Sequence, residues 1–296
     1  METKTNMKIT ILGSSGQIGA YLSEYLRERG HVVIDFDKEE TPNHDMTVIP
    51  NQYLENAIET SDFVFFLAFD VGGSRYLKKY QHTFQFIDNN TRLMANAFGL
   101  LGKYKKRFVF ASSQMSNMSY SPYGVMKRVG ELYTQTLSGL TVKFWNVYGI
   151  EHDKEKSHVI TDFIRRGFEE GEFEMLTDGT EERQFLYAED CCEALETIMN
   201  SYTDFKPEDP LHITSFRSDS IKRVAEIISG QFNLVGRHDV KIKPGLARDS
   251  VQLDKRNEAN NYILDWWMPK TTLDQGIAKV FAEMSKEYLT ESGEVK

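Results

Sequence analysis

Short apolar runs alternate with helical spacings of apolar residues along the first half of the chain. Residues 8–12, KITIL, form an apolar run, and Ile18, Leu22 and Leu26 then recur at helical spacing. Gly30 is expected to end that helix, and the next apolar run is VVIDFD. This order predicts a strand, a helix and a second strand at the start of the chain.

The same alternation continues to about residue 149. Further strands are predicted for TVIP, FVFFLAF, RFVFASS and TVKFWNVYG, and helical patterns at 84–101 and 123–137 lie between them. Strands that alternate with helices indicate a parallel sheet covered on both faces. The sequence therefore predicts an α/β fold, with a Rossmann-type doubly wound sheet that takes five or six strands from residues 8–149.

After Gly149 the pattern becomes a mixture of helices and short strands. Helices are predicted over 159–170, 188–201 and 220–232, and short strands over LHITS and DVKIK. We expect residues 1–149 to form one domain and residues 150–296 a smaller mixed α/β lobe. Some segments of this lobe are expected to return to the main sheet.

Composition and charge narrow the class of protein. The 296 residues are 40% hydrophobic and 27% charged, which is enough for a core without disulfides. Cys191 and Cys192 are adjacent and are expected to be reduced thiols within a helix. A net charge of −9 argues against a broad nucleic-acid or anionic-membrane surface. No apolar run spans a bilayer and no signal peptide is evident, so a cytoplasmic protein is expected.

A glycine-rich turn follows the first predicted strand. Gly13, Gly16 and Gly19 form Gly-x-x-Gly-x-x-Gly, which permits a tight turn and a close approach of the backbone to a pyrophosphate at the helix N-terminus. The pattern predicts a dinucleotide site in the first domain. Ser15, Gln17 and Ile18 of the same turn are expected to contact that dinucleotide.

An acidic residue ends the second predicted strand. Asp37 lies 24 positions after the first of these glycines, where a carboxylate can accept from both ribose hydroxyls and repel a 2′-phosphate. NAD is therefore favoured over NADP. Asp35 on the same strand face is the alternative assignment, and Lys38 could bind a phosphate. Asp45 and Met46 could flank the adenine.

A tyrosine and a lysine four positions apart follow the strand FVFASSQ. Ser121 can cap the next helix and Pro122 suits its first turn. Tyr123 and Lys127, at i and i+4, then project together near the carboxyl end of the sheet. Open α/β sheets bind ligands in the crevice at that end. The pair therefore indicates a catalytic site.

Taken together, the segments GSSGQIG, SDFVFFLAFDVGG, FVFASSQ, SPYGVMK, FWNVYG, DGTEERQFLYAEDCCEAL and DWWMPKTTLDQGI resemble the extended short-chain dehydrogenase/reductase superfamily, in its nucleotide-sugar epimerase/dehydratase branch. LAFDVGG also resembles the motif of GDP-mannose 3,5-epimerases, and SHVITDFIRR that of GDP-fucose synthases. The resemblance implies a homodimeric enzyme that uses NAD and acts on a nucleotide-diphosphate sugar, with a GDP-sugar favoured. Its dimer contacts are expected on the helices near 84–101 and 123–137.

The resemblance also implies roles for the catalytic residues. Tyr123 takes a proton from a sugar hydroxyl while hydride passes from the carbon to NAD⁺. Lys127 favours the phenolate by its charge and holds the nicotinamide ribose. Ser113 hydrogen-bonds the same sugar oxygen, with Ser112 as the alternative.

Further ligand contacts are implied by the same resemblance. Leu67 and Ala68 belong to the cofactor site, and Gly72, Gly73, Gln114, Asn146, His158, Arg183 and Arg248 to the substrate site. The two glycines would approach the sugar by their backbone. The two arginines would clamp the diphosphate, since guanidinium groups match phosphate oxygens. His158 matches the partner acid of the GDP-fucose synthase pattern. No metal site is expected.

Departures from the family pattern narrow the reaction. Ser113 is followed by Gln114 and Met115, where sugar 4,6-dehydratases carry an Asp-Glu pair and 3,5-epimerising relatives carry a cysteine at the second position. Neither side chain can move a proton. Oxidoreduction at one sugar carbon, most simply C4, remains, by a 4-epimerase or a 4-dehydrogenase that retains its cofactor. The alternatives are an NADPH-type 4-keto-sugar reductase and a non-catalytic dinucleotide-binding module.

Overall fold

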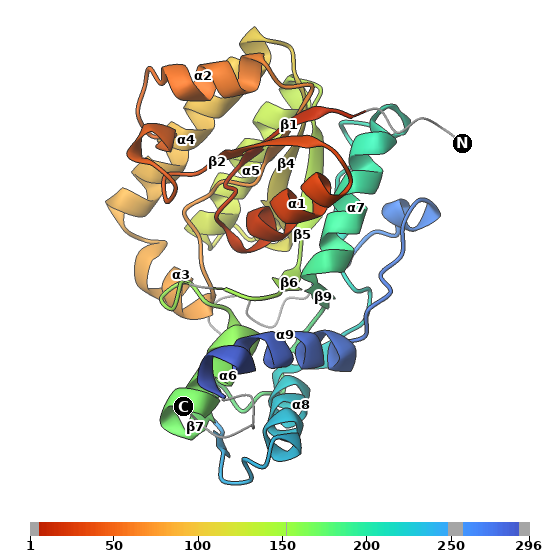
Figure 1. Ribbon diagram of the computed structural model, residues 1–296. Helices are drawn as coiled ribbons and strands as arrows, with labels where there is room; N and C mark the ends of the chain where they lie inside the picture. The colour runs from red at the N-terminus through yellow and green to blue at the C-terminus, as the bar shows by residue number, and fades with distance from the viewer. Residues whose placement is uncertain (1–5, 152, 248–256, 290–296) are drawn as a thin grey trace, which may run out of the picture.

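A six-stranded parallel sheet forms the centre of the computed structural model, which describes residues 6–151, 153–247 and 257–289. Its strand order is β10-β5-β4-β3-β1-β2 (Figure 1). The strands are β1 (Lys8–Leu12), β2 (Val32–Phe36), β3 (Phe63–Phe66), β4 (Arg107–Ser113), β5 (Leu140–Phe144) and β10 (Leu211–Ile213). Every neighbouring pair is parallel, which confirms the predicted Rossmann-type sheet.

Helices cover both faces of this sheet (Figure 1). One face packs against α1 (Gln17–Glu28) and α7 (Ala188–Asn200), and the other against α2 (Gln52–Glu59), α4 (Phe84–Lys103) and α5 (Pro122–Thr136). In β3, Phe63 and Phe65 pack on the face covered by α1 and α7, while Val64 and Phe66 pack on the face covered by α2, α4 and α5. Because consecutive side chains of a strand point to opposite faces, a strand covered on both sides must be apolar throughout.

One predicted strand was wrong, and another was wrong in part. TVIP forms turns, because Asp45 Oδ1 accepts hydrogen bonds from the backbone N and Oγ1 of Thr47 at 2.8 and 2.7 Å. TVKFWNVYG divides into β5 and β6 (Asn146–Tyr148), and β6 leaves the main sheet to pair with β9 (Phe185–Tyr187). The sixth strand of the main sheet is β10, which comes from the second half of the chain.

A second apolar core lies below the sheet in the view of Figure 1. It contains α6 (Val159–Glu170), α8 (Ile221–Leu234) and α9 (Leu273–Tyr288) and the short parallel pair of β7 (Glu172–Glu174) and β12 (Lys241–Lys243). The helices predicted at 159–170 and 220–232 are these α6 and α8. The division at residue 149 stays a prediction, and both β10 and α7 return to the main sheet from beyond it.

The remaining elements are short. They are α3 (Ser74–Tyr80), β8 (Glu182–Arg183), β11 (Asp219–Ser220) and the 3₁₀ turns Pro42–His44, Gln114–Asn117, Tyr202–Asp204 and Tyr262–Asp265. Cys191 and Cys192 are buried free thiols in α7, as predicted. Among the described residues, no helix is both long enough and apolar enough to cross a membrane.

Candidate functional site

A cleft of about 1590 Å³ opens where the strands of the main sheet end. Residues that follow β1, β2, β3, β4 and β5 line one side, and the loop before α6 and part of α9 line the rest. The carboxyl ends of parallel strands are the expected ligand site of this fold. The cleft therefore contains the place where a dinucleotide and a second ligand would meet.

The glycine-rich turn fits a pyrophosphate. Gly13 has φ +90°, and a Cβ there would lie 2.6 Å from the backbone N of Ala68. A Cβ on Gly19 would lie 2.0 Å from the carbonyl oxygen of Gly13, so α1 can press against the turn only without a side chain. Gly16 begins α1 without a capping side chain, so N–H groups at the helix start remain for an anion. This backbone cradle is suited to the diphosphate of NAD.

The end of β2 places Asp37 beside the same turn. Its Oδ2 accepts from the backbone N of Ser15 at 3.2 Å, and its Oδ1 accepts from the backbone N of Glu39 at 3.1 Å. Asp35, the alternative, pairs with Arg27 of α1 and does not line the cleft. The position of the two carboxylates therefore favours Asp37 as the ribose ligand. Ser15, Gln17, Ile18, Asp45, Met46, Leu67 and Ala68 also line the cleft.

The start of α5 brings Tyr123 into contact with Ser113. Ser121 Oγ accepts from the backbone N of Gly124 at 3.2 Å, and Pro122 occupies the first turn, as the sequence predicted. The side chain of Ser113 interacts with the phenol of Tyr123 and favours its ionised form. Its ring also packs edge-on against Phe69, with the ring centres 5.7 Å apart. The strand end and the helix start therefore hold the phenol and the hydroxyl together.

Lys127 is buried one turn further along α5. Its Nζ donates to the carbonyl oxygen of Ala111 at 2.6 Å and lies 3.8 Å from the ring centre of Phe69 and 5.9 Å from that of Tyr123. Burial lowers the pKa of Lys127 to about 7, although the charge of Glu131 opposes this. Burial also raises the pKa of Tyr123 to about 12, although the interaction with Ser113 opposes it. In the protein alone the phenol is therefore protonated at neutral pH.

The two serines at the end of β4 have different partners. Ser112 Oγ donates to Glu131 Oε1 at 2.6 Å, and Glu131 also pairs with Arg128 and Lys143 at 2.7 and 3.2 Å. Ser113 Oγ instead accepts from the backbone N of Met115 at 3.1 Å and meets Tyr123. Ser112 is thus committed to a buried ionic cluster, and this geometry favours Ser113 as the active-site hydroxyl.

Gly72 and Gly73 line the cleft, and the backbone N–H of Gly73 has a protein partner. The N–H of Gly73 donates to the carbonyl oxygen of Lys156 at 2.8 Å, so it is not available to a sugar. A Cβ on Gly73 would lie 2.6 Å from the carbonyl oxygen of Ser157, and one on Gly72 would lie 3.0 Å from Lys156 Cα. The glycines therefore allow the loop before α6 to pack against the loop after β3.

The remaining predicted substrate residues divide into two groups. Asn146, Gln114 and His158 line the cleft, and Oδ1 of Asn146 is buried without a hydrogen-bond partner within the described ranges. Such an atom suits a ligand donor. Arg183 does not line the cleft, and its Nη1 donates to the carbonyl oxygen of Glu182 at 2.8 Å. Arg248 lies outside the described residues.

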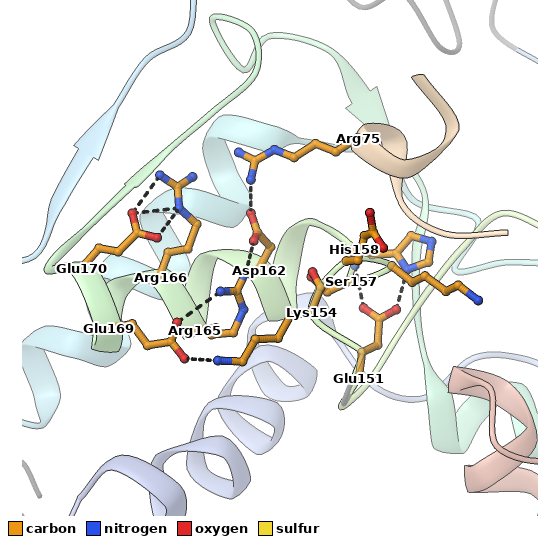
Figure 2. Close-up of polar contacts among 12 residues, drawn as sticks. Arg75, Glu151, Lys154, Ser157, His158, Asp162, Arg165, Arg166, Glu169 and Glu170 are labelled. Atoms are coloured by element: carbon orange, nitrogen blue, oxygen red, sulfur yellow. Dashed lines mark hydrogen bonds and ion pairs between the residues drawn. The ribbon is translucent and has the colours of Figure 1, made fainter. Parts of the chain in front are cut away.

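Several residues of the cleft were not predicted from the sequence. Glu151 bonds to His158, as Figure 2 shows, and both line the cleft. His44 also lines it and stacks on Phe36 with ring centres 4.3 Å apart. Lys279 of α9 reaches the cleft from the end of the chain. No local motif marks these residues, since they reach the cleft only through tertiary packing.

Comparison with known proteins gives the family. Residues 9–213 match the sequence model of the NAD dependent epimerase/dehydratase family. GDP-mannose 3,5-epimerase of Arabidopsis thaliana is 26% identical over 320 residues, which cover 92% of this chain and 80% of that protein. UDP-N-acetyl-alpha-D-glucosaminuronate decarboxylase of Bacillus cytotoxicus is 25% identical over 256 residues, 74% of this chain and 78% of that protein.

A solved structure agrees in fold. The epimerase Mth375 of Methanothermobacter thermautotrophicus superposes with a TM-score of 0.81 at 18% identity, covering 96% of this chain and 93% of that one. The glycine cradle, the Ser113–Tyr123 contact and the buried Lys127 occupy the cleft of this fold. The chain belongs to the NAD dependent epimerase/dehydratase family, it is an enzyme, and NAD is its cofactor.

Proposed function

We propose that this enzyme oxidises or reduces one sugar carbon, C4, of a nucleotide-diphosphate sugar, either as a 4-epimerase or as a 4-dehydrogenase that retains its NAD. The observation that carries the proposal is the contact of Ser113 with Tyr123 above the buried Lys127, in the same cleft as the glycine cradle. Residues 1–149 would hold the cofactor, and residues 150–296 would supply most contacts to the substrate.

Each residue of this cluster has a definite task. Tyr123 takes the proton of the C4 hydroxyl, and Ser113 hydrogen-bonds the same oxygen and orients it. Bound NAD⁺ supplies the hydride acceptor. Lys127 holds the ribose, and its Nζ lies 5.9 Å from the ring centre of Tyr123, where the protonated ammonium would favour the phenolate. Asn146 is available to the substrate through its buried Oδ1.

The side chains after Ser113 support oxidoreduction at a single carbon. Met115 is buried and lines the cleft, and a thioether neither gives nor accepts a proton at neutral pH. Gln114 engages Asn257, whose Nδ2 donates to Gln114 Oε1 at 2.6 Å. Neither residue can remove a proton from carbon or eliminate water. Dehydration and 3,5-epimerisation by the relatives' residues are therefore disfavoured.

The first experiment identifies the nucleotide that the purified protein releases on denaturation, by mass and by absorbance at 340 nm. NAD or NADH at about one per chain is the expected result and supports an internal redox cycle. Incubation with GDP-mannose and UDP-glucose, followed by analysis of the products, then separates epimerisation from net oxidation. A protein that turns over no nucleotide sugar with NAD or NADP would contradict the proposal.

A GDP-sugar is the favoured substrate, because LAFDVGG and SHVITDFIRR resemble the GDP-sugar branch. A homodimer is supported by apolar side chains on the outer faces of α4 and α5. Phe84 is 80% exposed, Leu132 50%, Tyr133 44% and Val125 43%. An apolar surface of this kind on two adjacent helices is typical of an interface. The mass of the protein in solution tests the dimer.

One observation favours the alternative of an NADPH-type 4-keto-sugar reductase. Lys38 lines the cleft directly after Asp37, and an ammonium group there could bind a 2′-phosphate. Purified protein without a bound nucleotide, together with tighter binding of NADPH than NADH, would support this alternative and contradict the role given to Asp37.

A further inference from the structure

The loop between β6 and α6 contains a carboxylate that bonds twice to one histidine. The backbone N of His158 donates to Glu151 Oε2 at 2.7 Å, and Nδ1 of the ring lies 2.6 Å from Glu151 Oε1 (Figure 2). The side chain of Glu151 is only 8% exposed, whereas that of His158 is 38% exposed. Both residues line the cleft. The two bonds fix the backbone and the ring of His158 together.

The bond to the ring decides which nitrogen of His158 is left for a ligand. An ionised carboxylate only accepts hydrogen bonds, so Nδ1 carries a hydrogen in the neutral ring as well as in the charged ring. Nε2 makes no hydrogen bond with any residue in the described ranges. Nε2 is therefore an acceptor toward the cleft when the ring is neutral and a donor when the ring is protonated.

Electrostatics favour the protonated ring. Burial alone would lower the pKa of His158, but the charge of Glu151 and its hydrogen bond raise the pKa above the ordinary value. The other ionisable side chains in the described part of the loop are Asp153, Lys154, Glu155 and Lys156, those of α3 are Arg75, Tyr76, Lys78, Lys79 and Tyr80, and those of α6 are Asp162, Arg165, Arg166, Glu169 and Glu170. None of them bonds to the ring, and Arg75 and Arg165 both pair with Asp162 (Figure 2).

The loop that carries this pair is anchored to neighbouring elements. Lys156 accepts from the backbone N of Gly73, and Thr161 Oγ1 donates to the carbonyl oxygen of Gly149 at 2.9 Å. Arg75 of α3 bonds to Asp162 of α6 at 3.0 Å. The position of His158 is therefore set by the fold before any ligand binds, and an anchored donor binds with less loss of entropy than a mobile one.

We propose that Glu151 is a positioning residue for substrate recognition, which holds protonated His158 so that Nε2–H donates a hydrogen bond to an oxygen of the sugar. This inference rests on the proposed function, because it takes the second ligand of the cleft to be a nucleotide-diphosphate sugar. Hydrogen bonds to charged groups are stronger than those between neutral groups, so the contact favours a sugar with an oxygen at that position.

Glu151→Gln tests the proposal, because the amide keeps the size of the side chain and removes its charge. The probe is whichever of GDP-mannose and UDP-glucose the wild type binds more tightly, and GDP or UDP without the sugar is the reference. Dissociation constants are measured by calorimetry from pH 6 to pH 9, with saturating NAD. Glu155→Gln is the matched control, because this exposed carboxylate of the same loop bonds to Lys79 and Tyr80 and lies outside the cleft lining.

The raised pKa sets the sign of the expected pH dependence. The wild type binds the nucleotide sugar tightly below the pKa of His158 and more weakly as the pH rises through it. In Glu151→Gln this weakening begins at a lower pH, and the affinity at pH 7.5 falls at least about ten-fold, as expected for loss of a charged hydrogen bond. Binding of GDP or UDP is unchanged. Glu155→Gln behaves as the wild type.

Three results would overturn the inference. The first is a pH dependence of nucleotide-sugar affinity in Glu151→Gln that equals that of the wild type. The second is an equal loss of affinity of Glu151→Gln for the nucleotide and for the nucleotide sugar. The third is a His158→Gln variant that keeps the wild-type pH dependence of binding. The last variant also decides the matter if Glu151→Gln does not fold. A wild type that binds the nucleotide sugar but transfers no hydride would refute the proposed function and leave this test intact.

Discussion

Lys127→Met should make the cofactor-free protein more stable, and the gain should depend on pH. Lys127 is only 3% exposed, and burial lowers the pKa of its ammonium from 10.5 to about 7. Its hydrogen bond to Ala111 and its contact with the ring of Phe69 offset only part of the lost hydration. Methionine fills a similar volume without a charge to desolvate.

The direction of this pH dependence follows from the number of protons that the folded and the unfolded chain bind. Above pH 10.5 the lysine is neutral in the folded and unfolded chains and adds no pH-dependent term. Between pH 10.5 and pH 7 the unfolded chain binds a proton that the folded chain does not. The free energy of unfolding of the wild type therefore falls by about 1.4 kcal/mol for each unit that the pH falls. Below pH 7 the loss is constant, at roughly 5 kcal/mol in total.

Chemical denaturation of wild type and variant from pH 6 to pH 9.5 measures this difference. The free energy of unfolding of Lys127→Met minus that of the wild type should increase steadily as the pH falls to 7 and then level off. Loss of the hydrogen bond from Nζ to Ala111 shifts this difference equally at every pH, so the slope of the difference against pH tests the prediction. Lys103→Met is the control, because this exposed lysine has a raised pKa and should give no slope over the range. A flat difference for Lys127→Met would refute the reasoning.

Three further predictions concern the cofactor and the chemistry. Tyr123→Phe should lower kcat about 10²- to 10⁴-fold without changing the NAD bound per chain, because it removes only the proton acceptor; a loss under ten-fold would contradict its role. Gly19→Ala should reduce the nucleotide released on denaturation and the Tm, because its Cβ would lie 2.0 Å from the carbonyl oxygen of Gly13; wild-type NAD content would argue against the cradle. Asp37→Asn should narrow the preference for NADH over NADPH at least about ten-fold in fluorescence titrations, and an unchanged ratio would exclude Asp37 as the ribose ligand.

Most of the main sheet could be predicted because its strands obey one rule. A strand covered on both faces is mostly apolar, and FVFF and FVFA are fully apolar runs of this kind, while KITIL departs from the rule only at Lys8 and Thr10. The short β10 could be predicted as a strand, but its place at the edge of the main sheet depends on packing after residue 149. TVIP satisfied the strand pattern and still forms a turn, because Asp45 offers the backbone of Thr47 a local partner.

The site could be predicted where its residues lie close in sequence to a strand end or helix start. Gly13, Asp37, Ser113 and Tyr123 follow this rule, and all of them line the cleft. Arg183 matched a family motif, yet it lies outside the cleft lining, because a motif does not specify where the side chain of a short edge strand points. Glu151 had no motif, and its bond to His158 becomes visible only when the loop is folded.

The buried Lys127 and the pair of Glu151 and His158 solve opposite electrostatic problems in one cleft. Burial drives the ammonium of Lys127 toward its neutral form, so its positive charge is available for catalysis only at a cost in stability. Glu151 opposes the same effect of burial at His158 and raises the pKa of this ring above its ordinary value without help from a ligand. A ligand that brings negative charge would favour the ammonium of Lys127 in the same way. The positive charge of Lys127 should therefore depend on a ligand in the cleft, whereas Glu151 already favours the charge of His158 before a ligand binds.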